Sequence, residues 1–228
     1  MIWFLGDLLD NPPALFAFVA AFGVALVTGI TFHEFSHAWA AYELGDSTAE
    51  RQGRLSLNPV RHLDPTGTVM MLLVGFGWGR PTPVNPYRLR TGPKAGNALV
   101  ALAGPISNLV VASIAALPLR LGLVDSVATV DGIADASGTE IVGLFLIFII
   151  FLNVLLAVFN LIPIHPLDGF KVAVGVLPGE LSRQLQALAP YGPGILGVLI
   201  LLSWIAPQYN VLGWFIGGVT DVIFNLLL

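Results

Sequence analysis

The motif HEFSH, residues 33–37, combines residue types and a spacing that could catalyse metal-dependent hydrolysis. His33 and His37 are four residues apart and therefore share one face of a helix, where two imidazoles can bind a single Zn²⁺. Glu34 could then act as a general base that activates a water molecule on the metal. The alternative is a helix end with two unrelated histidines, but His and Glu within an apolar helix are costly and rarely incidental. The motif therefore predicts a zinc site.

A catalytic zinc site also needs a third protein ligand and one open coordination position. The chain has no Cys, which excludes thiolate ligands, disulfides, thiol nucleophiles and iron–sulfur clusters. Asp168 is the strongest candidate, because the apolar segment before it is expected to end at the same depth as the HEFSH motif. A structural alternative for Asp168 is the cap of a turn. Asp64 and His62 are weaker candidates, since Asp before Pro is typical of a turn.

The composition indicates which kind of fold must position these residues. Hydrophobic residues make up 56% of the 228 residues and charged residues only 11%, whereas soluble domains have about 25% charged residues. Gly and Pro lie within long apolar runs rather than in polar low-complexity tracts, which argues against disorder. The composition predicts an all-α polytopic membrane protein with about four or five transmembrane helices. Residues 1–228 are expected to form a single domain within the lipid bilayer.

Long apolar segments mark the expected transmembrane helices. The first begins with twenty uncharged residues, which as a helix reach across about 30 Å of hydrocarbon. We expect an interruption at Gly104-Pro105 in the second and an end before Pro163 in the third. The expected spans, in chain order, are residues 14–43, 95–119, 141–162, 194–206 and, unless it lies along the interface, 211–228.

Residues 66–79 form an apolar run of only fourteen residues, which is too short to span comfortably. Three arginines precede this run and three follow it, so both flanks favour the same side of the membrane. We therefore expect residues 66–86 to form a re-entrant or hairpin element. Its tail, GFGWGRPTPVNP, is expected to have irregular backbone that is buried against protein.

The distribution of charge predicts the orientation. Seven of the ten Lys and Arg residues lie between the first two long spans, which makes that stretch cytoplasmic by the positive-inside rule. The first thirteen residues contain two Asp but no Lys or Arg, so they lack the basic region of a signal peptide and are expected outside. Residues 124–140 are acidic and are also expected outside. Because topology explains the basic stretch, the sequence gives no support for nucleic-acid binding.

Four asparagines could line a water-filled cavity, which hydrolysis inside a membrane requires. Asn97 and Asn108 are three helical turns apart, and Asn153 and Asn160 are two turns apart, so each pair shares a helix face. The alternative is that these amides bond the helices together, for about 0.6 kcal/mol each.

Three motifs in this order resemble the site-2 proteases, intramembrane zinc metalloproteases that cut transmembrane helices. They are HEFSH, AGPISN at 103–108 and NLIPIHPLDG at 160–169. The segment GRLSLNPVRHLDPTG, residues 53–67, is similar to the compact bacterial branch that lacks PDZ and CBS domains.

The resemblance implies that His33, His37 and Asp168 bind one Zn²⁺ per chain and that Glu34 is the general base and acid. It also implies that Asn160 and Asn108 help to bind the substrate. The expected substrate is a membrane protein that is cut in or near a transmembrane helix. The expected location is the bacterial cytoplasmic membrane, with the active site toward the cytoplasm. The sequence does not indicate the oligomeric state.

His165 is a departure from the family pattern, which commonly has Pro at this position. It lies between Pro163 and Pro166, so the segment cannot be regular helix. In polyproline-like geometry, residues three apart face the same way, which brings His165 to the side of Asp168. We expect it near the site, either along the substrate path or as an occasional fourth ligand.

Other activities would fit parts of this pattern. A metal transporter could also place His and Asp inside the membrane, but its ligands should exchange across both faces. An inactive homologue could bind membrane proteins without cutting them, although all the expected catalytic residues are present.

A helical substrate must be unwound before hydrolysis, and residues 75–86 could pair with it as an added strand.

Overall fold

The computed structural model describes residues 11–74, 77–125 and 137–228. Helices dominate these residues, and no β-strand occurs among them apart from an isolated antiparallel bridge between Leu63 and Gly79. The prediction of an all-α protein is therefore confirmed.

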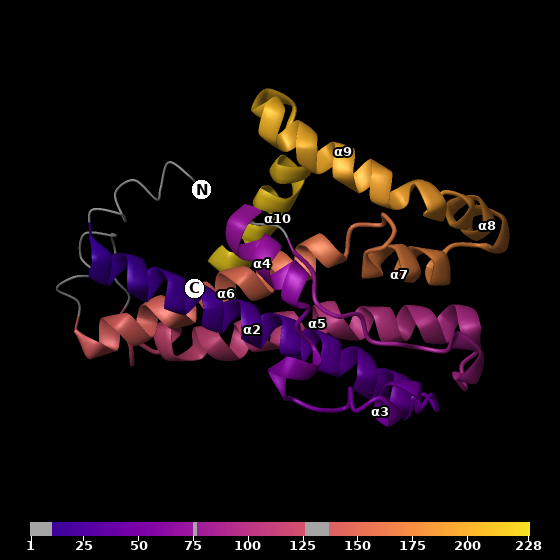
Figure 1. Cartoon of the computed structure of the whole chain (residues 1–228), viewed down its shortest axis with the longest axis horizontal. Coiled ribbons are helices and arrows are strands. Elements are labelled where there is room, and N and C mark those ends of the chain that lie inside the picture. Colours follow the sequence, from indigo (N-terminus) through magenta and orange to yellow (C-terminus); the bar gives the residue numbers. More distant parts are fainter. Residues whose placement is uncertain (1–10, 75–76, 126–136) are drawn as a thin grey trace.

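Nine α-helices and four short 3-10 helices occur in the described part of the chain (Figure 1). In chain order they are α2 (Pro12–Glu43), α3 (Thr48–Arg51), α4 (Pro65–Val74), α5 (Pro93–Arg120), α6 (Gly138–Asn160), α7 (Asp168–Val176), α8 (Gly179–Ala187), α9 (Gly192–Ile205) and α10 (Val211–Leu227). Within the described residues, four helical stretches are long and apolar enough to cross a membrane. They are α2, α5, α6 and the stretch Gly179–Ile205. This confirms the polytopic membrane class.

Helix α2 carries the HEFSH motif close to its C-terminal end. Its start is set by Asn11, whose side-chain oxygen accepts a hydrogen bond from the backbone N–H of Ala14 at 3.2 Å. The two prolines that follow Asn11 suit the first turn, where no N–H is needed. With 32 residues the helix is about 48 Å long, which exceeds the hydrocarbon thickness of about 30 Å. The motif can therefore lie at one end of the apolar layer.

Helix α5 packs against α2, α6 and α7 and forms the centre of the bundle. The interruption expected at Gly104-Pro105 is wrong, because α5 continues through both residues. A proline inside a transmembrane helix is tolerated where neighbouring helices pack around it, and here Gly104 and Pro105 are both buried. Small side chains along the buried face of α5, among them Ala98 and Ala101, let the neighbouring helices approach closely.

The loop between α6 and α7 brings Asp168 to the bundle. Helix α6 ends at Asn160, three residues before Pro163, and Asp168 is the first residue of α7. The loop is packed so tightly that a Cβ at Gly169 would lie 2.1 Å from the carbonyl oxygen of Leu161. Only glycine fits there, which explains the Asp-Gly pair that starts α7.

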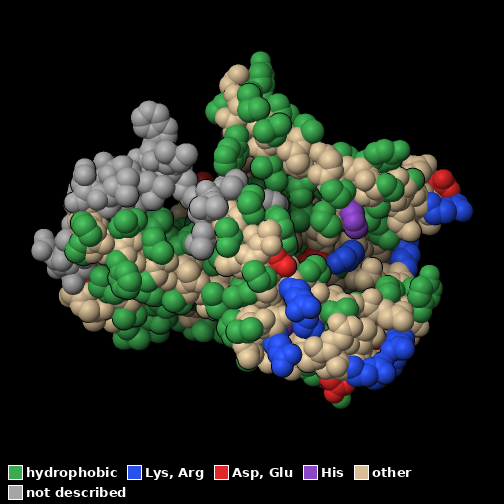
Figure 2. Space-filling model, viewed as in Figure 1, with side chains coloured by type: hydrophobic (Ala, Val, Ile, Leu, Met, Phe, Trp, Pro, Cys, Tyr) green, Lys and Arg blue, Asp and Glu red, His purple; other side chains and the backbone are tan. Residues whose placement is uncertain are grey.

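The last three helices complete the molecule. Helix α10 packs against α6, and Leu196 of α9 and Ile216 of α10 join the main hydrophobic cluster. Helix α9 leads away from the core toward the top of the view in Figure 1. In Figure 2, Lys and Arg side chains gather toward the end of the molecule that carries α3 and α8, and none is visible at the opposite end.

Candidate active site

Three side chains expected to bind zinc meet inside the bundle. His33 Nε2 lies 3.0 Å from His37 Nε2, and Asp168 Oδ2 lies 3.1 Å and 3.0 Å from these two nitrogens. All three residues are buried, with exposed fractions of 5–7%. The structure thus brings together residues of α2 and α7 that are more than 130 positions apart in the sequence.

The hydrogen bonds behind His33 fix its tautomer. The side-chain amide nitrogen of Asn108 donates to the carbonyl oxygen of Gly29 at 3.0 Å, and a carbonyl can only accept. Asn108 therefore turns Oδ1 toward His33 Nδ1, at 2.7 Å, and Nδ1 must carry the proton. The lone pair of His33 is left on Nε2, which faces Asp168.

His37 is oriented in the same way by the backbone of α5. Its Nδ1 lies 2.8 Å from the carbonyl oxygen of Val100, so Nδ1–H donates to that oxygen. The lone pair of Nε2 then faces His33 and Asp168. Histidines that bind metals commonly donate their second N–H to a carbonyl or a side-chain oxygen.

The arrangement fits a divalent metal ion. With both imidazoles neutral, as metal binding requires, three lone-pair donors converge: Nε2 of His33, Nε2 of His37 and Oδ2 of Asp168. Tetrahedral zinc with ligands at about 2.0–2.1 Å requires ligand atoms about 3.3 Å apart, which is close to the observed triangle. The second carboxylate oxygen of Asp168 is bound by Lys171 Nζ at 3.0 Å, so only Oδ2 faces the triangle. The donor set is two nitrogens and one oxygen, as in catalytic zinc sites.

Gly104 allows α5 to pass directly beside the two imidazoles. A Cβ at this position would lie 2.5 Å from His37 Nε2 and 2.7 Å from His33 Cε1. Any larger residue would therefore displace a candidate ligand. This gives a physical reason for glycine in the AGPISN motif.

The side chain of Glu34 forms hydrogen bonds with Thr82, whereas those of His33 and His37 bond to other residues. Its side-chain oxygen Oε2 accepts hydrogen bonds from the backbone N–H of Thr82 at 2.8 Å and from the Thr82 hydroxyl at 2.7 Å. Its carboxylate is not part of the three-residue ligand group. The placement suits a base beside the metal rather than a ligand. Thr82 was not identified from the sequence, since a single Thr in a Pro-rich segment gives no recognisable pattern.

Thr82 belongs to an irregular segment, residues 77–85, that contacts α2 through Thr82. The backbone N–H of Arg80 donates to the carbonyl oxygen of His62 at 2.7 Å. Near its other end, the backbone N–H of Asn85 donates to Asp46 Oδ2 at 2.6 Å. The backbone of residues 77–85 is irregular, as the sequence predicts, but none of these residues is buried; residues 75–76 lie outside the described residues.

Arg54 holds the same segment from the loop after α3. It is buried, and its guanidinium donates to the carbonyl oxygens of Arg61, Arg80 and Pro81, the last two at 3.1 Å and 3.3 Å. Arg54 and Asp46 were not singled out from the sequence. Their burial depends on how the loop folds back on α2, which charge patterning does not reveal.

The remaining asparagines differ in their surroundings. Asn108 and Asn153 are fully buried and bonded to each other, with Asn108 Nδ2 donating to Asn153 Oδ1 at 2.8 Å. They therefore do not line an open cavity, and they bond α5 to α6. Asn160 is half-buried, and its amide nitrogen donates to the carbonyl oxygen of Leu156 at 2.9 Å. Asn97 is also half-buried.

The other candidate ligands lie outside the metal triangle. Asp64 does not form a separate turn but caps the start of α4, where its carboxylate accepts from the backbone N–H of Gly67 at 2.8 Å. His62 is fully buried and donates from Nε2 to the carbonyl oxygen of Ser56 at 2.6 Å. The ring of His165 contacts the ring of Phe170 edge to face, with 5.4 Å between the ring centroids. His165 is not in the ligand group.

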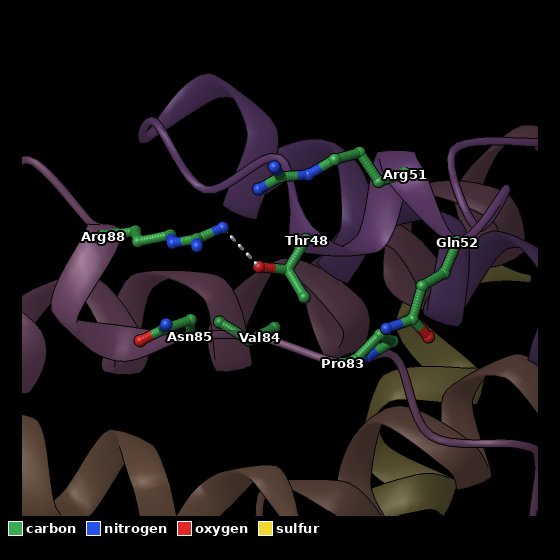
Figure 3. A pocket seen from close by; sticks show the side chains of 7 residues that line it. All are labelled: Thr48, Arg51, Gln52, Pro83, Val84, Asn85 and Arg88. Atoms are coloured by element: carbon green, nitrogen blue, oxygen red, sulfur yellow. Dashed lines mark hydrogen bonds between the residues drawn. The ribbon is translucent and has the colours of Figure 1, made fainter.

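Two hollows lie beside these elements. A polar pocket of about 380 Å³ is lined by α3, Gln52, residues 83–85 and Arg88, and Arg88 donates to the Thr48 hydroxyl at 3.4 Å (Figure 3). An apolar groove of about 880 Å³ lies along α2 and α5 and includes Phe32 and Ile106. None of the three candidate ligands lines either of them.

Comparisons with known proteins identify the family of the chain. The sequence profile of Peptidase family M50 matches residues 119–202. "Putative zinc metalloprotease YwhC" of Bacillus subtilis is 37% identical over 198 residues, which cover 84% of this chain and 83% of the relative. "Putative zinc metalloprotease Rip2" of Mycobacterium tuberculosis is 32% identical over 224 residues, 96% of this chain and 78% of the relative. No solved structure matches the chain.

The chain belongs to peptidase family M50, the site-2 protease family. With its apolar helices, it is an integral membrane protein and a metalloprotease by family. The profile match covers Asn160 and Asp168 but not the HEFSH motif, while the similarity to the two relatives extends over most of the chain.

Proposed function

We propose that this protein is an intramembrane zinc metalloprotease that hydrolyses peptide bonds in or near the transmembrane helices of membrane-protein substrates. Such cleavage would serve regulated intramembrane proteolysis. The observation that carries the proposal is the triangle of His33, His37 and Asp168, buried among helices that are long and apolar enough to span a membrane. One Zn²⁺ per chain would be held by these three residues.

Bound Zn²⁺ would supply Lewis acidity to the peptide carbonyl and make a water molecule easier to deprotonate. Glu34 would take a proton from that water while the water oxygen forms a bond to the carbonyl carbon of the peptide. As the C–N bond breaks, Glu34 would return the proton to the leaving amine nitrogen. Lys171 and Asn108 would hold Asp168 and His33 in place through the hydrogen bonds described above.

The substrate must present an extended peptide to this site, because a helix hides its amide groups in internal hydrogen bonds. We propose that the 77–85 segment receives the unwound peptide as an added strand. Two features support this: the segment belongs to no helix or strand, and its Thr82 contacts Glu34. Asn160, half-buried near the end of α6, would help to hold the substrate backbone.

The proposed orientation places the N-terminus outside and the active site toward the cytoplasm. Lys and Arg gather toward one end of the molecule (Figure 2), as expected for a cytoplasmic face. His33 and His37 lie in the last third of α2, and the stretch that follows α2 contains Arg51, Arg54 and Arg61.

The decisive test compares membrane-protein fragments in cells that carry the native chain or the Glu34→Gln variant. Loss of a general base typically costs 10²–10⁴-fold in rate or more. We expect fragments that depend on the native chain to disappear in the variant while zinc content is unchanged. Glu43→Gln is the matched control, because it makes the same change at an exposed position nine residues later on α2. Full cleavage by Glu34→Gln would reject the proposed mechanism.

A further inference from the structure

We infer that Thr82 is a positioning residue for Glu34: it holds one oxygen of the carboxylate so that the other is presented to the reacting water. The inference rests on the proposed function, in which Glu34 is the general base. Its basis is the pair of hydrogen bonds from Thr82 N–H and Thr82 Oγ1 to the same atom, Glu34 Oε2, at 2.8 Å and 2.7 Å.

Two donors on one oxygen restrict the carboxylate more than a single bond would. The N–H fixes the position of Oε2, and the hydroxyl approaches the same oxygen from the side chain, so rotation that exchanges the two oxygens would break both bonds. Thr82 Oγ1 also lies 3.0 Å from the backbone carbonyl oxygen of Glu34. The single hydroxyl proton of Thr82 can bond either the carboxylate or the backbone carbonyl of Glu34 at one time. The hydrogen bond from the Thr82 backbone N–H to the carboxylate is present in both cases.

Thr82 can act in this way only if it is itself fixed, and the structure shows how. Pro81 and Pro83 flank it, and proline restricts the backbone on both sides. The Pro81 carbonyl accepts from Arg54, and the N–H of Asn85 is bound by Asp46. Two buried charged residues therefore hold the segment on either side of Thr82. A residue that orients a catalytic group works best on such a rigid support.

The test is Thr82→Val, which keeps the shape and the backbone N–H but removes the hydroxyl. Misplacement of a catalytic group by about 1 Å can cost about 10²-fold in rate. We expect kcat to fall about 10- to 100-fold, with KM and zinc content unchanged, in the purified chain acting on a membrane-protein substrate. Thr82→Ser restores the hydroxyl and should recover most of the rate.

Thr31→Val is the matched control. Thr31 lies three residues before Glu34 on α2, is buried, and its hydroxyl has no hydrogen-bond partner. The same substitution there removes a hydroxyl close to the motif without removing a contact. We expect its kcat to equal that of the native chain.

Several results would overturn the inference. An unchanged or higher kcat in Thr82→Val would show that the contact does not assist the base, and an increase confined to KM would show that Thr82 serves the substrate. Thr82→Ala provides a second variant, and loss of zinc from both would make the role structural. If Glu34→Gln itself retains activity, the proposed function fails, whereas a normal Thr82→Val beside an inactive Glu34→Gln rejects only the role of Thr82.

Discussion

Asn108 Oδ1 lies 2.7 Å from His33 Nδ1, so a residue of α5 determines which nitrogen a histidine of α2 presents to the candidate metal site. The orientation of Asn108 is fixed by hydrogen bonds from its Nδ2 to the carbonyl oxygen of Gly29 and to Oδ1 of Asn153 on α6. The three central helices therefore converge on one imidazole through a single buried amide. The metal site and the packing of the bundle are linked at this residue.

Asn108→Ala should weaken zinc binding about 10- to 100-fold, as expected when a group that orients a metal ligand is removed. It should also destabilise the protein by about 1–3 kcal/mol, because the N–H of His33 would be buried without an acceptor. Zinc titration and thermal unfolding would measure the two effects. Asn97→Ala, the same change three helical turns earlier on α5, should leave zinc affinity unchanged. Equal zinc affinity in both variants would contradict the role given to Asn108.

Asp168→Asn should lose the metal, because a neutral amide binds Zn²⁺ much less well than a carboxylate. The substitution also removes the ion pair with Lys171. Elemental analysis of the purified chain provides the measurement. Asp64→Asn is the control, since the Asp64 side chain accepts a backbone N–H in the first turn of α4, and this variant should retain full zinc content. Unchanged zinc in Asp168→Asn would place the third ligand elsewhere.

The chemistry at the centre of the molecule could be anticipated from the sequence. The HEFSH spacing on a helix and the absence of Cys left few candidate ligands, and the structure brings His33, His37 and Asp168 together. Helical spacing also fixes which side chains share a face, so local rules were sufficient for the two histidines. Lys171 could have been found in the same way, because it lies three residues after Asp168 on α7.

Contacts made by irregular backbone could not be anticipated. The partners of Thr82, Arg54 and Asp46 depend on a loop that folds back on α2, and such pairings have no periodicity in the sequence. Asn108 was expected at the substrate, but its whole side chain is used inside the bundle. Helix faces alone do not show whether an amide meets water or another helix.

Asp46 should make stability depend on pH at the acidic end. Burial raises the pKa of its carboxyl, but hydrogen bonds from Thr48 and the N–H of Asn85, with Arg88 nearby, outweigh burial and hold the pKa below its ordinary value of 3.8. A lowered pKa means that the ionised form stabilises the fold above pH 3.8, and that this contribution is lost as the pH falls through the lowered value.

The measurement compares thermal unfolding of the native chain and Asp46→Asn at neutral and acidic pH. At neutral pH the variant should unfold at a lower temperature, because its amide would turn an N–H₂ group toward a backbone donor. The difference should shrink below pH 3.8. Glu50→Gln removes a carboxylate at an exposed position in α3 and is the control for the loss of one negative charge. A constant gap at all pH values would contradict the role of the ionised carboxylate.

His165→Ala should retain zinc stoichiometry and change activity several-fold at most. A fourth permanent protein ligand would fill the position that catalytic zinc sites keep open, and His165 instead contacts Phe170. Elemental analysis and a cleavage assay on the same preparation would decide. Loss of zinc would show that His165 is a ligand and would remove Asp168 from the first coordination sphere.

The orientation can be tested by cysteine labelling, for which the chain has no background because it contains no native Cys. Three single variants, Glu50→Cys, Arg90→Cys and Val130→Cys, sample the two basic stretches and the acidic loop. In intact cells, a membrane-impermeant thiol reagent should label position 130 but neither 50 nor 90, and after lysis it should label all three. Labelling of 50 and 90 but not 130 would show the inverted orientation. Opposite labelling of 50 and 90 would show that residues 66–79 cross the membrane, in contradiction to the hairpin that the flanking arginines favour.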